Sequence, residues 1–343
     1  MKMKRMSAIV LTASLLWAGT LSGCSGNPQG SSGESRQGVE GGGDTIKVGV
    51  VSAISGSYSL EGKFVKNALT ILEEETNTAG GIERNGKKYK VRFIYEDNEG
   101  KPDISVNAFR KLIDQDKILA LVGPPMSSCL LAAGPIAQQS KIPAIGTMTT
   151  NVACTQIGNY IFRACFIDAF QAQVAVKYIL NDLHMKKVAV ISNNADAYSQ
   201  ALATEFEKVF KKEGGDLVKF QTYAGSDVKD FNVQLTKIKE SNPDVIFAPC
   251  AYMDIPLIIQ QARNMGITAR FLGTDSWDTP EMLKLAGNKN IEGAEYIAAF
   301  STENPDPLSM AFTKKYRDKY NEAPNSNATF AYDAALIALE GIK

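Results

Sequence analysis

The sequence holds little of the chemistry on which metal sites and many active sites depend. Among its 343 residues there is one histidine, His184, and none of the five cysteines forms a Cys-x-x-Cys pair. Zinc sites use Cys and His ligands at short spacings, so this composition argues against a metal site. A Ser-His-Asp triad could use only His184, which follows a helical pattern and is better explained as a capping or surface residue. We therefore expect no metal and no enzymatic activity.

Signatures of nucleotide and nucleic acid binding are missing as well. There is no Gly-x-Gly-x-x-Gly motif, and residues 81–88 (GIERNGKK) lack the Ser or Thr with which a phosphate loop holds magnesium. Asn85-Gly86 in that segment predicts a hairpin or tight turn instead. The 37 Lys and Arg residues balance the 37 Asp and Glu residues, without a basic patch that interleaves with aromatic residues. We expect no cofactor and no nucleic acid partner.

Apolar runs long enough to span a bilayer are also absent. The apolar run at residues 9–18 (IVLTASLLWA) is too short, and it follows the positively charged start MKMKR. It leads into Leu-Ser-Gly-Cys, which ends at Cys24 and resembles the lipobox of bacterial lipoproteins. The resemblance implies that residues 1–23 are a signal peptide and that Cys24 carries lipid, which anchors the protein outside the cytoplasm. The alternative is an ordinary signal peptide with an incidental cysteine.

For the rest of the chain, the sequence predicts a linker followed by a folded region. Residues 24–45 are rich in Gly and Ser and nearly free of apolar residues, which predicts a flexible linker. Four further cysteines lie among apolar neighbours, at Cys129, Cys154, Cys165 and Cys250. Export permits disulfides, and four cysteines allow three pairings, but such neighbours favour buried free thiols.

Short β-branched runs alternate with amphipathic segments from residue 45 onward. The predicted strands are 46–51, 90–95, 118–122, 143–146, 187–192, 218–223, 244–248, 270–273 and 295–300. The predicted helices between them include 62–78, 103–114, 170–183, 197–212, 230–241 and 255–265. Near-continuous apolar strands such as VAVIS predict parallel sheets that are covered on both faces and connected by right-handed crossovers. A chain of this length predicts two α/β lobes.

Two neighbouring strands end in polar residues suited to an anion. The strand 118–122 is followed by Gly-Pro-Pro-Met and then by Ser127, which opens a helix. The strand 143–146 is followed by Thr-Met-Thr-Thr, which ends at Thr150. Helix N-termini and hydroxyls at the carboxyl edge of a parallel sheet bind anions, and ligands of open α/β sheets lie at this edge. The alternative is that Ser127 and Thr150 merely cap and turn the chain.

Six segments resemble the extracellular solute-binding proteins of branched-chain amino acid ABC transporters. They are residues 46–55 (IKVGVVSAIS), 80–82 (GGI), 123–128 (GPPMSS), 160–163 (YIFR), 273–275 (GTD) and 331–334 (AYDA). The resemblance implies a type I periplasmic-binding fold, in which two hinged, Rossmann-like, doubly wound lobes with parallel sheets close on a ligand. It places residues 46–167 and 276–343 in lobe 1 and residues 168–275 in lobe 2.

The resemblance also implies which residues bind the ligand. Ser127, Thr150 and the backbone around Met148 would bind an α-carboxylate in lobe 1. Asp254 would accept from the α-ammonium in lobe 2, and Tyr198 falls on the cleft tyrosine of the family. A zwitterion needs donors on one lobe and a carboxylate on the other, so this division makes physical sense. The alternative for Asp254 is a plain helix N-cap.

The chain departs from the family pattern at two places. The leucine/isoleucine/valine-binding proteins place an aromatic residue over the ligand where this chain has Glu61, and nearby Tyr58 could substitute for it. Glu61 raises the alternative of a more polar or cationic ligand. Family members also continue beyond the position of Lys343 into a third crossover, so either the sequence is a fragment or the cleft is assembled without those pieces.

Taken together, the sequence predicts a non-enzymatic, lipid-anchored binding protein that captures an amino acid, branched-chain or similar, and delivers it to ABC permease subunits. We expect it to be a monomer. One alternative is a binding protein for an amide or an aromatic carboxylate. Another is an extracellular ligand-sensing domain that reports to a receptor.

Overall fold

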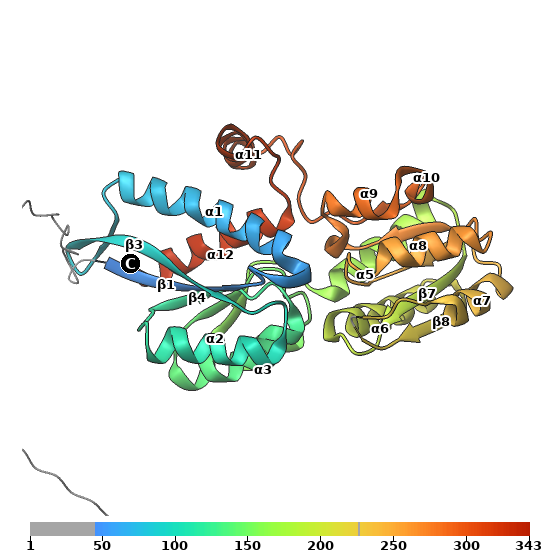
Figure 1. Ribbon diagram of the computed structural model, residues 1–343, viewed down its shortest axis with the longest axis horizontal. Coiled ribbons are helices and arrows are strands. Elements are labelled where there is room, and N and C mark those ends of the chain that lie inside the picture. Colours follow the sequence, from blue (N-terminus) through green and yellow to red (C-terminus); the bar gives the residue numbers. More distant parts are fainter. Residues whose placement is uncertain (1–44, 226) are drawn as a thin grey trace, which may run out of the picture. The chain divides into compact units, whose positions relative to one another are not determined.

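The computed structural model describes residues 45–225 and 227–343, which form two α/β lobes (Figure 1). The predicted signal peptide, Cys24 and all of the predicted linker except Thr45 lie outside the described residues. Within the described part of the chain, no helix has the length and apolar character needed to cross a membrane.

Lobe 1 is built on a six-stranded sheet in the order β2-β3-β1-β4-β5-β6. Its strands are β1 (Thr45–Ser52), β2 (Ile82–Arg84), β3 (Lys87–Asp97), β4 (Ala120–Val122), β5 (Ala144–Gly146) and β6 (Ile161–Arg163). All neighbouring strands are parallel except β2, which pairs antiparallel with β3 through the predicted turn at Asn85-Gly86. Parallel strands align their carboxyl ends at one edge, and this edge carries the candidate site.

Helices cover both faces of this sheet, as the apolar strands predicted. Figure 1 shows α1 and α12 on one side and α2 and α3 on the other. The bounds are α1 (Ser59–Thr78), α2 (Pro102–Asp114), α3 (Ser127–Ser140) and α12 (Ser326–Ile342). The predicted apolar face of α1, with Val65, Leu69 and Leu72, is buried against β1 and α12. Truncation of a fully buried leucine such as Leu69 typically costs about 2–5 kcal/mol, so this layer holds the lobe together.

Lobe 2 is built on a five-stranded parallel sheet in the order β11-β10-β9-β7-β8. The strands are β7 (Lys187–Asn193), β8 (Asp216–Tyr223), β9 (Val245–Phe247), β10 (Arg270–Gly273) and β11 (Glu295–Tyr296). The helices that pack on it are α5 (Asp168–Lys177), α6 (Ala197–Lys212), α7 (Asn232–Glu240) and α8 (Ile255–Asn264). One apolar core lies with α5 and α6 and a second lies with α7 and α8, so both faces of this sheet are covered too.

The segment after β10 differs from the sequence-based expectation. Residues 276–343 are predicted to belong to lobe 1, but β11 pairs with β10 in the second sheet. Trp277 and Met282 are buried in the same apolar core as α8. The short helices α9 (Glu281–Ala286) and α10 (Asn288–Ile291) also lie against α8. The chain therefore adds to lobe 2 beyond residue 275, and the other lobe boundaries stay a prediction.

Some elements were not predicted from the sequence. Strand β6 was not predicted, and β11 is only two residues long where residues 295–300 were predicted. The helices α4 (Ala153–Gln156) and α11 (Pro307–Tyr320) were also missed. A three-residue strand such as β6 has too little alternation to stand out from a loop.

Candidate functional site

The carboxyl ends of β4 and β5 bring the predicted anion-binding residues together. Ser127 is the first residue of α3 and is almost fully buried. Its Oγ accepts a hydrogen bond of 3.3 Å from the backbone N–H of Asn151, in the loop that follows β5. The hydroxyl groups of Thr147, Thr149 and Thr150 are buried in this loop without a hydrogen-bond partner among the described residues. Buried polar groups are normally paired, so this loop has capacity for a polar ligand.

The first turn of α3 adds backbone donors to this loop. Within the described residues, no side chain caps the helix, whose N-cap position is Met126. The first N–H groups of a helix have no partner inside the helix, and the helix dipole makes this end positive. The Ser127 side chain does not cap α3; its Oγ accepts from the backbone of the neighbouring loop. Met148 lies in this loop and is half-buried.

Asp254 lies at the start of α8 in lobe 2 and is 6% exposed. Its side chain does not cap α8; instead Oδ2 accepts a 2.6 Å hydrogen bond from the hydroxyl of Tyr223. The plain N-cap alternative is therefore wrong. Burial raises the pKa of Asp254 to about 6, while the Tyr223 hydroxyl acts in the opposite direction. The carboxylate is thus charged at neutral pH but incompletely neutralised, which suits a ligand ammonium.

Tyr198 lies in the first turn of α6 and forms hydrogen bonds with residues that follow β10. Its hydroxyl donates to Oδ1 of Asp275 at 2.7 Å and lies 2.7 Å from Oγ1 of Thr274. The same Oδ1 of Asp275 accepts from Nε2 of Gln171 at 2.9 Å. Burial raises the pKa of Asp275, and these donors oppose that effect. Residues 273–275 (GTD) were predicted only as part of the family resemblance, and no role was predicted for Asp275. The sequence signal for a role is an acid just after an apolar strand.

The beginning of α1 brings Tyr58 and Glu61 toward lobe 2. The Tyr58 ring meets the Tyr252 ring edge-on at 5.8 Å between centroids, and the Tyr252 hydroxyl donates to the Ser57 carbonyl at 3.1 Å. Burial raises the pKa of Glu61 to about 8, and the negative charge of Asp275 adds to the rise. The charge of Asp275 in lobe 2 therefore acts on Glu61 in lobe 1.

A glycine fixes where Glu61 sits. A Cβ atom on Gly62 would lie 2.1 Å from the backbone oxygen of Ala53, which follows β1. Only glycine permits this close approach between the first turn of α1 and the end of β1. The sequence thus places the carboxylate at position 61 on a rigid, closely packed turn.

The candidate site is consequently rich in acidic residues that are buried or half-buried. Besides Glu61, Asp254 and Asp275, it includes Asp168 at the start of α5, whose pKa burial raises to about 7. The Thr150 hydroxyl lies close enough to lower the pKa of Asp168, although neither oxygen of that carboxylate has a well-formed hydrogen bond in the described chain. These acids do not make a metal centre: no group of three potential ligands occurs among residues 45–225 and 227–343. At neutral pH the raised pKa keeps Glu61 mostly protonated, whereas Asp254 is mostly charged and is therefore the better partner for a ligand ammonium.

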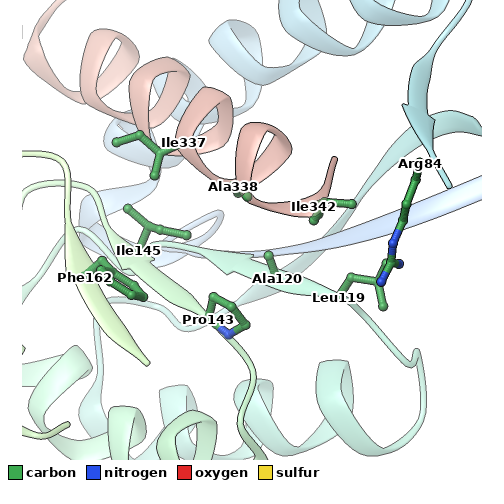
Figure 2. Close-up of a pocket in the computed structure, with 10 residues that line it drawn as sticks. Arg84, Leu119, Ala120, Pro143, Ile145, Phe162, Ile337, Ala338 and Ile342 are labelled. Atoms are coloured by element: carbon green, nitrogen blue, oxygen red, sulfur yellow. The ribbon is translucent and has the colours of Figure 1, made fainter. Parts of the chain in front are cut away.

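A separate cavity lies elsewhere in lobe 1 (Figure 2). It has a volume of about 310 Å³ and lies between α12 and the amino ends of β4 and β5, near Ala120 and Pro143. Ile337 and Phe162, at two sides of this cavity, are 49% and 44% exposed. None of the seven predicted ligand-binding residues lines this cavity. The candidate site is at the opposite, carboxyl edge of the sheet.

The four described cysteines are buried free thiols, as their apolar neighbours predicted. Cys154 donates to the Ser127 carbonyl at 3.7 Å, and Cys250 donates to the Ile191 carbonyl at 3.3 Å. Burial raises the pKa of the Cys154 thiol to about 11 and that of Cys250 to about 12. Thiols protonated to this extent are poor nucleophiles, so they act as packing residues.

Two parallel α/β lobes with polar residues at the carboxyl edges of their sheets define the class of two-lobed solute-binding proteins. The chain belongs to the periplasmic binding protein family, because residues 45–343 match the sequence model of that family. This family comprises solute-binding proteins rather than enzymes. The membership confirms both the predicted resemblance and the predicted fold.

Individual relatives agree with the family assignment. An amino acid binding protein of Pseudomonas aeruginosa is 32% identical over 277 residues, which cover 80% of this chain and 71% of that protein. A leucine-binding protein of Thermotoga maritima has a TM-score of 0.80 and 29% identity, over 87% of this chain and 82% of that one. A branched-chain amino acid transporter substrate-binding protein of Streptococcus pneumoniae, solved with isoleucine, has a TM-score of 0.79 and 31% identity, over 86% and 83% of the two chains.

Proposed function

We propose that this protein captures an amino acid between its lobes and delivers it to the permease of an ABC transporter. The observation that carries the proposal is the division of charge-binding groups between the lobes. Ser127 and the loop through Thr150 offer hydroxyl and N–H donors, whereas Asp254 offers a buried carboxylate. The similarity to an amino acid binding protein and to a protein solved with isoleucine supports this ligand class.

The physical argument rests on the two charges of a zwitterion. An α-carboxylate that binds at the N-terminus of α3 gains charge-assisted hydrogen bonds, as an α-ammonium does at Asp254. Because the two sites belong to different lobes, a ligand that occupies both stabilises the closed arrangement. Hydrogen bonds already cross between the two lobes. Asn151 Nδ2 donates to the Ala197 carbonyl at 2.9 Å, the Tyr252 hydroxyl donates to the Ser57 carbonyl, and the Asp168 N–H donates to the Thr150 carbonyl at 3.0 Å. The proposed hinge divides residues 46–167 from 168–275.

Thermal unfolding with a panel of ligands tests this function. Leucine, isoleucine or valine is expected to raise the unfolding midpoint, because a ligand that binds only the folded form stabilises it by about 2.7 kcal/mol at a hundred times Kd. Benzoate and simple amides serve as comparison ligands. A shift with benzoate or an amide, and none with any amino acid, would replace this proposal with the alternative ligand class.

Glu61→Gln is expected to flatten the pH dependence of stability. Burial raises the pKa of Glu61 from 4.5 to about 8, so the folded protein keeps a proton that the unfolded chain releases within this window. The unfolded state binds fewer protons there, and the free energy of unfolding therefore falls as pH rises. The variant should match the parent in acid and exceed it in alkali when unfolding midpoints are measured across pH.

Glu281→Gln is the matched control, since Glu281 also lies in the first turn of a helix and is half-buried. Parallel pH profiles for Glu61→Gln and the parent would contradict the assignment of a half-buried acid with a raised pKa at position 61. The same variant sorts the ligand classes: affinity for a neutral amino acid should not change, whereas a large loss would indicate a ligand with a cationic side chain.

The proposal includes attachment to the membrane. We place the mature protein outside the cytoplasm as a monomer, held by lipid on Cys24 and separated from the membrane by the linker 24–45. The motif Leu-Ser-Gly-Cys after a short apolar run supports this part of the proposal.

A further inference from the structure

We propose that Arg163 is a positioning residue that shapes the carboxylate-binding loop and determines the preference of the site for a ligand carboxylate. Arg163 is the last residue of β6 and pairs in register with Gly146 at the end of β5. The chain continues from Gly146 directly into the loop of residues 147–152. The side chain of Arg163 therefore starts beside this loop. The inference rests on the proposed function, because it assumes that the ligand has a carboxylate.

The guanidinium of Arg163 donates hydrogen bonds to four backbone carbonyl oxygens of this loop. Nη1 donates to the carbonyls of Thr149, Thr150 and Asn151 at 2.9, 3.0 and 2.8 Å. Nη2 donates to the carbonyl of Val152 at 3.1 Å and to the hydroxyl of Thr155. Four consecutive carbonyls thus point toward a single cation.

This arrangement decides what the opposite side of the loop presents. A trans peptide is planar, so its N–H points away from its C=O. The Thr150 carbonyl points to Arg163, and the N–H of Asn151 accordingly points away, where it donates to Ser127 Oγ. The loop consequently has a carbonyl side that faces Arg163 and a donor side that faces Ser127. The Thr150 N–H is already bonded to the Met148 carbonyl at 3.0 Å, so the loop offers an anion the Asn151 N–H and the unpaired threonine hydroxyls.

Electrostatics supports the same role. Carbonyl oxygens carry partial negative charge, and a guanidinium that covers four of them offsets the field that would repel an anion. The Arg163 charge also opposes the rise in the pKa of Asp168, whose backbone N–H donates to the Thr150 carbonyl at 3.0 Å. A lysine ammonium is a point charge without the planar fork, so it cannot hold these carbonyls in the same arrangement.

The test compares two ligands that differ only at the carboxylate, L-leucine and L-leucinamide, by calorimetry with the full chain. Arg163→Lys is expected to weaken leucine binding by about tenfold or more, because the forked contacts are lost. Leucinamide binding should change by less than about threefold, since a neutral amide depends less on the donor side of the loop. Amide hydrogen exchange without ligand should become faster in the peptide of residues 148–152.

Arg263→Lys is the matched control. Arg263 donates to the carbonyls of Ile267, Ala269 and Asn290 near the far end of α8, so it makes the same kind of contact away from the loop. It should lower the unfolding midpoint without changing the ratio of leucine to leucinamide affinity. Equal losses for both ligands in Arg163→Lys, or unchanged exchange at residues 148–152, would overturn the inference. If the parent protein fails to bind leucine, the proposed function is in question, whereas the exchange measurement still decides the role of Arg163.

Discussion

Asp254→Ala is expected to weaken amino acid binding by about 2–5 kcal/mol, because truncation leaves a desolvated ligand ammonium without its partner. Asp254 is buried, and its only hydrogen bond from a described side chain comes from Tyr223, so one oxygen remains available for the ligand. Ser127→Ala should cost less, about 1–2 kcal/mol, since backbone donors of α3 remain. Binding should also weaken as pH falls through about 6, where Asp254 takes up a proton.

Calorimetry with leucine or isoleucine measures these losses. Asp306→Ala provides a control for helix capping, because Asp306 accepts from the N–H groups of Leu308 and Ser309 at the start of α11. That variant should lose stability and keep its affinity. Asp254→Ala with the affinity of the parent would exclude Asp254 as the ammonium site.

The fold was predictable wherever local pattern and general geometry agree. Continuous apolar strands predicted sheets covered on both faces, and Asn85-Gly86 predicted the β2–β3 hairpin. Ser127 and Thr150 were expected to meet because adjacent parallel strands share a carboxyl edge, and the Ser127–Asn151 hydrogen bond confirms that the two loops meet. These inferences require only the order of the strands and the direction of their ends.

Long-range side-chain geometry was not predictable in this way. Tyr198 and Asp275 are 77 positions apart, and no local pattern indicates that their side chains bond. Arg163 was part of a family motif, but its contacts with four carbonyls depend on how the earlier loop of residues 147–152 folds against the end of β6. The segment with Trp277 and Met282 joined lobe 2 for a similar reason. The amphipathic pattern of a segment predicts that it packs on an apolar core, but the pattern does not predict which of the two lobes supplies that core.

Cys24→Ala is expected to release the protein from the membrane or leave it unprocessed. The motif that ends at Cys24 supplies the thiol that would take a diacylglycerol, and no helix among the described residues is long and apolar enough to cross a membrane. Acyl chains contribute about 0.8 kcal/mol per buried CH₂, so several chains hold a protein durably and their loss is close to all-or-none. Fractionation followed by immunoblotting should show the variant outside the membrane fraction or at the size of the precursor.

Ser22→Ala is the matched control, because it keeps a small residue before the cysteine and should leave anchoring intact. Mass spectrometry of the membrane fraction should identify a lipid-modified amino-terminal peptide that begins at Cys24. An unmodified peptide that starts elsewhere would favour the ordinary signal peptide. A variant Cys24→Ala that stays in the membrane fraction at mature size would likewise exclude lipid on Cys24 as the anchor.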